Sequence, residues 1–149
     1  MTPPPSIEAP AFAHLARATA PPTVADMRVR DAAGAGVLSC SSLATVPEMG
    51  RLMASNEVHS LIVWQAGGVR WRVVTDLDVA FAALCRPGVL ADDLARHAPS
   101  IAEDASLLRA ITVMREQRTS DLVVVDTSER PTAILSALDI AAMVGCAGD

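Results

Sequence analysis

The sequence predicts an α/β (α+β) fold built from two copies of one β-α-β-β-α unit. Short apolar segments rich in Val, Ile and Leu alternate with stretches in which apolar residues recur at helical spacing, as strands and helices do. The same order of segments occurs in both halves. From Ser39 and Ser100 onward the halves align without a gap at an offset of 61 residues. An internal repeat determines the architecture before any single motif does.

Matching residues define this offset. Asp78 and Asp139 are 61 positions apart, and the same separation relates Met53 to Met114, Leu61 to Leu122 and Cys85 to Cys146. One unit is too small to bury both faces of its own sheet. We therefore expect the two repeats to pack sheet to sheet around a pseudo-twofold axis. The predicted boundaries are a Pro-rich N-terminal tail at 1–22, a first repeat at 23–86 and a second repeat at 87–149.

The first repeat contains an amphipathic helix, because Val46, Met49, Leu52 and Met53 follow helical spacing. The apolar run at 59–64 predicts a strand covered on both faces. The predicted elements are a helical lead-in at 23–27, a strand at 37–40, a helix at 45–56, strands at 59–64 and 69–75 around a turn at 65–68, and a helix at 77–84.

The second repeat is expected to follow the same order, with a turn where polar residues interrupt two apolar runs. In the tail, prolines favour extended backbone outside the core, although 12–17 could form one or two helical turns. The predicted elements of the second repeat are a lead-in at 90–94, a strand at 100–101, a helix at 106–118, strands at 121–126 and 132–136 around a turn at 127–130, and a helix at 138–144.

Composition and charge exclude several classes of protein. The chain has 149 residues, is 51% hydrophobic and only 3% aromatic, and carries a formal charge of −5 with arginine as its only basic residue besides histidine. Such a chain is a poor ligand for nucleic acid or for anionic lipid surfaces. No apolar run is long enough to span a bilayer and no signal peptide is evident. We expect a cytoplasmic protein that binds neither nucleic acid nor membrane.

Sites for metals and for catalysis are not evident in the sequence. The three cysteines and three histidines are scattered, without the spacing of a metal centre. Nucleophile motifs and Gly-rich phosphate loops are missing as well. The sequence therefore predicts no metal site, no required cofactor and no enzymatic activity.

A hydroxyl residue followed three positions later by an aspartate occurs twice, as Thr75 with Asp78 and as Ser136 with Asp139. Each pair precedes a predicted helix, so it fits a capping box that stabilises the helix start by about 1 kcal/mol. The same carboxylates could also bind the hydroxyl groups of a ligand. The two interpretations are compatible, and the sequence leaves both open.

These duplicated motifs, the apolar strands around Leu61-Ile62-Val63 and Leu122-Val123-Val124, and the order of elements resemble a tandem pair of cystathionine-β-synthase (CBS) domains, also called a Bateman module, as a stand-alone protein. The resemblance covers about 23–145. It implies a regulatory module that senses an adenosine-containing molecule such as AMP, ADP, ATP or S-adenosylmethionine. It also implies two sites between the repeats, the first formed by Asp139, Ser136, Ile134, Leu38, Val58 and His59, the second by Asp78, Thr75, Val73, Pro99, Thr119 and Ser120.

The chain departs from the family pattern at two positions. A glycine commonly stands three residues before the Thr or Ser, whereas Arg72 and Ala133 stand there in this chain. Arg72 would either partly block the site of Asp78 or reach an anionic phosphate, and Arg118 is the other phosphate candidate. Asp121, beside Ser120, would repel phosphate, so AMP or an adenosyl compound fits the site that contains Ser120, the site of Asp78, better than a triphosphate does.

The resemblance also implies partners. CBS pairs commonly form flat homodimers, so we expect a homodimer that passes the state of its ligand to itself or to an unknown protein partner. The alternative is a ligand-free dimerisation or adaptor domain whose cleft has degenerated.

Overall fold

The computed structural model describes residues 23–34 and 36–147, so the predicted Pro-rich tail at 1–22 lies outside the described residues. Thirteen elements follow one another along the chain. They are η1 (Val24–Asp26), α2 (Val29–Ala32), β1 (Ser39–Ser41), α3 (Val46–Asn56), β2 (Ser60–Trp64), β3 (Trp71–Thr75), α4 (Asp76–Cys85), α5 (Ala91–Leu94), β4 (Ser100–Ala102), α6 (Leu107–Gln117), β5 (Asp121–Val125), β6 (Pro131–Ser136) and α7 (Ala137–Ala147).

The strands form two three-stranded sheets of identical topology, with the orders β1-β2-β3 and β4-β5-β6. In each sheet the first two strands are parallel and the last two are antiparallel. The pairing is equivalent in the two sheets, since Ser60 lies opposite Thr75 and Asp121 lies opposite Ser136. The predicted fold class and the predicted β-α-β-β-α order are confirmed.

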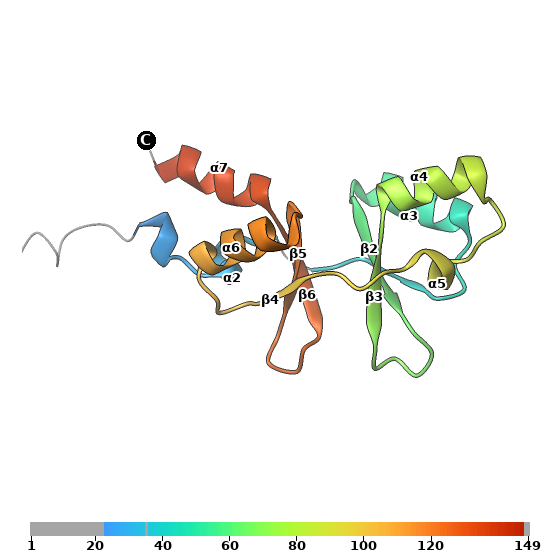
Figure 1. The fold of residues 1–149 in the computed structure, drawn as a ribbon, viewed down its shortest axis with the longest axis horizontal. Coiled ribbons are helices and arrows are strands. Elements are labelled where there is room, and N and C mark those ends of the chain that lie inside the picture. Colours follow the sequence, from blue (N-terminus) through green and yellow to red (C-terminus); the bar gives the residue numbers. More distant parts are fainter. Residues whose placement is uncertain (1–22, 35, 148–149) are drawn as a thin grey trace, which may run out of the picture.

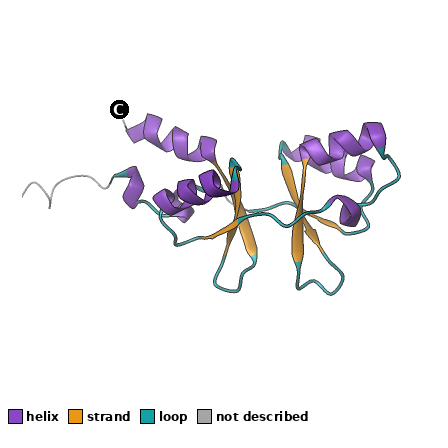
Figure 2. Cartoon of the chain, viewed as in Figure 1, coloured by secondary structure: helices purple, strands orange, loops and turns teal. Residues whose placement is uncertain are grey.

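The sheets face each other in the middle of the molecule and the helices cover their outer faces (Figures 1 and 2). Ile62 and Val73 of the first sheet meet Val123 of the second in a buried apolar cluster. A separate core lies behind each sheet, with Leu61 under α3 and α4 and Leu122 under α6 and α7. The apolar strands are covered on both faces, which explains their nearly continuous hydrophobic sequences.

The short lead-in helices pack on the opposite repeats. Val29 of α2 is fully buried in the core of the second repeat, and Ala91 of α5 is fully buried in the core of the first. Matching hydrogen bonds hold them: Val29 N donates to Ala105 O and Ala91 N donates to Ala44 O, both at 2.8 Å. The predicted boundaries 23–86 and 87–149 divide the chain in sequence order. In space, the lead-in of each repeat packs into the core of the other repeat.

Most predicted elements agree with the structure to within one or two residues. The strand predicted at 69–75 is shorter, because Gly67 and Gly68 adopt positive φ and the loop extends to residue 70 before pairing begins at Trp71. The lead-in at 23–27 contains η1, and the sequence pattern did not predict α2 behind it. The longest helices of the described part have 11 residues, and none could cross a membrane.

Candidate functional site

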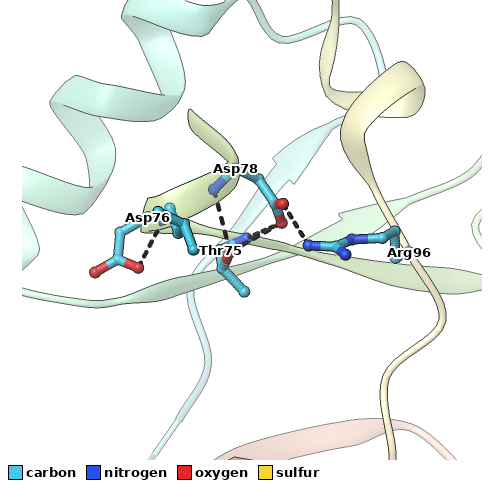
Figure 3. A network of polar contacts seen from close by, with 5 residues as sticks. Thr75, Asp76, Asp78 and Arg96 are labelled. Atoms are coloured by element: carbon cyan, nitrogen blue, oxygen red, sulfur yellow. Dashed lines mark hydrogen bonds and ion pairs between the residues drawn. The ribbon is translucent and has the colours of Figure 1, made fainter. Parts of the chain in front are cut away.

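The Thr75–Asp78 motif forms the capping box predicted from the sequence (Figure 3). Thr75 is the N-cap residue of α4, and its hydroxyl accepts a hydrogen bond from Asp78 N at 3.3 Å. Asp78 Oδ2 accepts from Thr75 N at 3.1 Å and from Thr75 Oγ1 at 2.9 Å. Reciprocal bonds of this kind satisfy backbone donors that have no partner within the helix. Capping therefore uses one oxygen of the carboxylate.

The second oxygen of Asp78 is occupied by an arginine from the segment that follows α5. Arg96 Nη2 forms an ion pair with Asp78 Oδ1 (Figure 3). The backbone of Arg96 also exchanges two hydrogen bonds with Val73 of β3, each at 2.9 Å. The Asp78 side chain is only 16% exposed, whereas that of Arg96 is 71% exposed. Both oxygens of Asp78 thus have partners inside the protein.

The Ser136–Asp139 motif forms an equivalent helix start for α7. Asp139 Oδ2 accepts a hydrogen bond from Ser136 N at 2.8 Å, and Ser136 Oγ accepts from Asp139 N at 3.1 Å. Within residues 23–34 and 36–147, Asp139 Oδ1 has neither a hydrogen bond nor an ion pair. The Ser136–Asp139 motif, the Asp139 half-site, therefore keeps one carboxylate oxygen available to a donor from outside these residues.

Several charged side chains lie near the start of β5, beside Asp139. His59 Nδ1 lies 2.8 Å from Asp76 Oδ2, and this hydrogen bond raises the pKa of the imidazole. Partial desolvation raises the pKa of the Asp121 carboxyl, the nearby His59 lowers it, and the Asp139 and Asp76 carboxylates raise it further. The structure therefore brings His59 of the first repeat close enough to Asp121 of the second for each to shift the pKa of the other.

The other predicted residues lie in the middle of the molecule, against the core of the first repeat, or near strand starts. Val73 and Ile134 lie in the apolar cluster between the sheets. Leu38 and Val58 pack against the core of the first repeat. Pro99, Thr119 and Ser120 contribute backbone contacts at strand starts, where Pro99 O accepts from Val123 N at 3.1 Å, Ser120 O accepts from Ala137 N at 2.8 Å, and Thr119 N donates to Met114 O at 3.0 Å.

The two phosphate candidates lie in different surroundings. Arg72 is exposed on β3 and lines a groove of about 1130 Å³ between the two hairpins, together with Arg70, Arg130 and His97. Across this groove, Trp71 Nε1 donates to Glu129 O at 3.2 Å. Arg118 ends α6 in the left-handed conformation, with φ +53°, as Glu57 ends α3.

An apolar groove of about 600 Å³ lies between α3 and α4, and its lining includes Val58, His59 and Asp76. A third hollow of about 620 Å³ lies beside Cys40 and Leu52. Neither Asp78 nor Asp139 lines any of these three hollows. In the described residues, no group of three or more His, Cys, Asp or Glu side chains is arranged to hold a metal ion.

Sequence reasoning missed Arg96 and Asp76. Arg96 is 18 residues beyond Asp78 and outside every motif, so only the folded chain shows that they meet. Asp76 is adjacent to Thr75, yet its partner His59 is 17 residues away.

Comparisons with known proteins agree with this architecture. Residues 91–145 match the family model described as CBS domain. No curated protein is significantly similar to the chain. Among solved structures, the CBS domain pair of protein MJ0100 in complex with 5′-methylthioadenosine and S-adenosyl-L-methionine is 18% identical, with a TM-score of 0.72 over 81% of this chain and 98% of that chain.

Two further structures are similar to the same extent. A CBS domain protein from Pyrobaculum aerophilum, PAE2072, complexed with AMP, is 21% identical, with a TM-score of 0.70 over 83% of this chain and all of that chain. The CBS domain of the bacterial CNNM/CorC family Mg²⁺ transporter in complex with ATP is 11% identical, with a TM-score of 0.70 over 82% and 89%. The second repeat is therefore a CBS domain. The chain as a whole has the fold of a tandem CBS domain pair, a Bateman module.

Proposed function

We propose that this CBS domain pair is a regulatory module that binds an adenosine-containing ligand between its repeats, at the half-site of Asp139. The observation that carries the proposal is the Oδ1 of Asp139, which has no partner among the described residues and lies beside a capping box that already fixes the side chain. A carboxylate oxygen held in this way can accept hydrogen bonds from ribose hydroxyls, and bonds to a charged acceptor are the stronger kind. Backbone groups and aliphatic side chains at the neighbouring strand ends suit a flat base.

Similar structures support the class of ligand. The three similar structures are complexes with 5′-methylthioadenosine and S-adenosyl-L-methionine, with AMP and with ATP, all of them adenosine derivatives. The carboxylate of Asp121 adds negative charge beside Asp139. A ligand with less negative charge fits these surroundings better than a triphosphate, since like charges repel. We therefore place S-adenosylmethionine and AMP before ADP and ATP.

The proposed action is regulatory rather than catalytic. A ligand that binds one arrangement of the two repeats more tightly than another shifts the population toward that arrangement. The contact between Trp71 and Glu129 joins the two hairpins, so it would report a change in how the repeats pack. Such a shift could be passed to a second subunit or to another protein.

A homodimer is the second part of the proposal. Leu77, Phe81 and Leu84 follow one another at helical spacing on α4 and are exposed. Leu77 and its repeat equivalent on α7, Leu138, are 75% and 76% exposed. Exposed apolar groups on both α4 and α7, related by the internal repeat, suit a twofold partner that presents the same surface.

The dimer is tested by light scattering coupled to size exclusion. We expect the wild type to elute as a dimer and the double variant Leu77→Glu with Leu138→Glu to elute as a monomer. Leu43→Glu is the matched control, because Leu43 is 70% exposed but lies outside α4 and α7. A wild-type monomer would refute the homodimer.

Ligand binding is tested by thermal unfolding with AMP, ADP, ATP, S-adenosylmethionine and NAD, followed by calorimetric titration of any compound that stabilises the protein. A ligand at 100 times its dissociation constant stabilises by about 2.7 kcal/mol, which is readily seen. Unchanged unfolding with every compound, together with a stable dimer, would favour the alternative of a ligand-free dimerisation or adaptor domain.

A further inference from the structure

The two lead-in segments can be aligned residue by residue through their hydrogen bonds. Val29 and Ala91 donate to the equivalent carbonyls of Ala105 and Ala44, and Arg30 and Asp92 donate to those of Glu103 and Ser42. The two donors of each kind, Val29 with Ala91 and Arg30 with Asp92, are 62 positions apart. The first turns then close identically, because Ala33 N donates to Val29 O and Ala95 N donates to Ala91 O, both at 2.9 Å.

The residue that follows Ala95 is Arg96, and the residue that follows Ala33 is Gly34. The two segments then differ in length. Leu38 and Pro99 are equivalent, because Leu38 O accepts from Ile62 N and Pro99 O accepts from Val123 N, yet Leu38 is five positions beyond Ala33 and Pro99 only four beyond Ala95. Arg96 therefore has no single equivalent in the first lead-in.

Arg96 pairs with the carboxylate oxygen of Asp78 that the capping box does not use. Its backbone is fixed to Val73 by two hydrogen bonds, which holds the side chain beside the start of α4. Its guanidinium balances the charge of the carboxylate, while Thr75 donates to Oδ2. Ribose hydroxyls would have to compete with the guanidinium for this carboxylate.

We propose that Arg96 closes the Asp78 half-site, so that each chain binds one adenosine-type ligand, at Asp139. Arg96 is then the residue that determines the number of working sites. This inference rests on the proposed function. The sequence suggested that Arg72 partly blocks the site of Asp78, and the inference assigns this role to Arg96 instead. Arg72 lines the groove between the two hairpins, as His97 does.

The test replaces Arg96 in the full chain and counts sites by calorimetric titration with S-adenosylmethionine and with AMP. We expect one equivalent for the wild type and two for Arg96→Ala. The double variant Arg96→Ala with Asp139→Asn should bind one equivalent tightly, now at Asp78. Removal of Arg96 should raise the affinity of the Asp78 half-site by about tenfold or more, as expected for hydrogen bonds to a charged group.

Arg96→Ala is compatible with folding. Arg96 has an exposed side chain, and alanine retains the two backbone bonds to Val73. Arg86→Ala is the matched control, because Arg86 is an exposed arginine at the end of α4, and this variant should still bind one equivalent.

The outcomes separate this inference from the proposed function. Absence of binding to the wild type and to Arg96→Ala would overturn both. Two equivalents on the wild type would overturn the inference and leave the function standing. The same conclusion would follow if Arg96→Ala bound no more ligand than the wild type, or less, because Arg96 would then be neutral or a ligand contact.

Discussion

The Asp78 and Asp139 half-sites begin from the same local structure and differ in what surrounds it. In both, an aspartate accepts a hydrogen bond from the backbone of a Thr or Ser three residues earlier and caps a helix. Asp78 then pairs with Arg96, while Asp139 lies beside Asp121 and keeps one oxygen free within the described residues. A duplicated motif therefore fixes the start of the helix, whereas the neighbouring segments decide whether its carboxylate is available to a ligand.

The exchange of lead-ins explains why the half-sites could diverge. The segment after α5 crosses the first repeat and pairs with Val73, so residues of the linker contact the site without belonging to its motif. A single substitution in such a segment changes one half-site and leaves both helical cores intact. Five further experiments test how far the two halves differ.

The largest effect is expected for the scaffold, where the halves should behave alike. Leu61 and Leu122 are repeat equivalents and are 0% and 1% exposed. Leu61→Ala and Leu122→Ala should each lower the free energy of unfolding by about 2–5 kcal/mol, because each creates a cavity behind its sheet. Chemical denaturation measures both. A near-neutral effect of either substitution would contradict the equivalence of the two cores.

The next effect separates the half-sites. Asp139→Asn removes the charge but keeps an acceptor for the capping bond to Ser136 N, and we expect it to weaken S-adenosylmethionine or AMP binding by about tenfold to a hundredfold. Asp78→Asn should leave the affinity unchanged, because Arg96 already occupies that carboxylate. Calorimetric titration compares the two variants. Equal losses would show that both carboxylates contact the ligand.

Asp121→Asn should reduce the difference in charge between the two half-sites. Removal of this carboxylate lowers the repulsion beside Asp139, so we expect ATP to bind about threefold to tenfold more tightly, with a smaller gain at high salt. S-adenosylmethionine should gain nothing. Titrations at two salt concentrations measure the change, and an equal gain for both ligands would contradict the electrostatic explanation.

The same variant should affect stability in a defined range of pH. The pKa of Asp121 is raised in the folded protein, so its ionised form is disfavoured there. This destabilising effect is present above the raised pKa and disappears as the pH falls through it toward the ordinary value of 3.8. Asp121→Asn should therefore unfold at a higher temperature than the wild type near neutral pH, and the difference should vanish in acid.

The smallest effect is expected for His59. Its hydrogen bond to Asp76 raises the pKa of the imidazole, so the stabilisation is fully present below the ordinary pKa of 6.5 and is lost as the pH rises through the raised value. The difference in unfolding temperature between wild type and His59→Gln should be larger at about pH 5 than at about pH 8. The reverse trend would contradict the assignment. The change should be slight, because the ion pair is exposed.

The sequence alone determined the repeat, the fold class and the two capping motifs. These depend on local patterns: the spacing of Met49 and Met53 on one helix face, the apolar strand after Ser60, and a hydroxyl residue three positions before Asp78 and before Asp139. Because the same pattern occurs twice at one offset, it also predicted that two sheets pack together. Local propensity was sufficient for each of these conclusions.

Only the tertiary structure decided which parts of the chain meet. The crossing of the lead-ins, the pairing of Arg96 with Asp78 and the approach of His59 to Asp121 join residues that are 18 or more positions apart. No periodicity in sequence records such contacts, because they depend on how the two repeats are placed relative to each other. Arg72 lies three residues before Thr75, at a position where the sequence departs from the family pattern. Arg96, outside it, forms the ion pair, because the folded linker lies against β3 at that point.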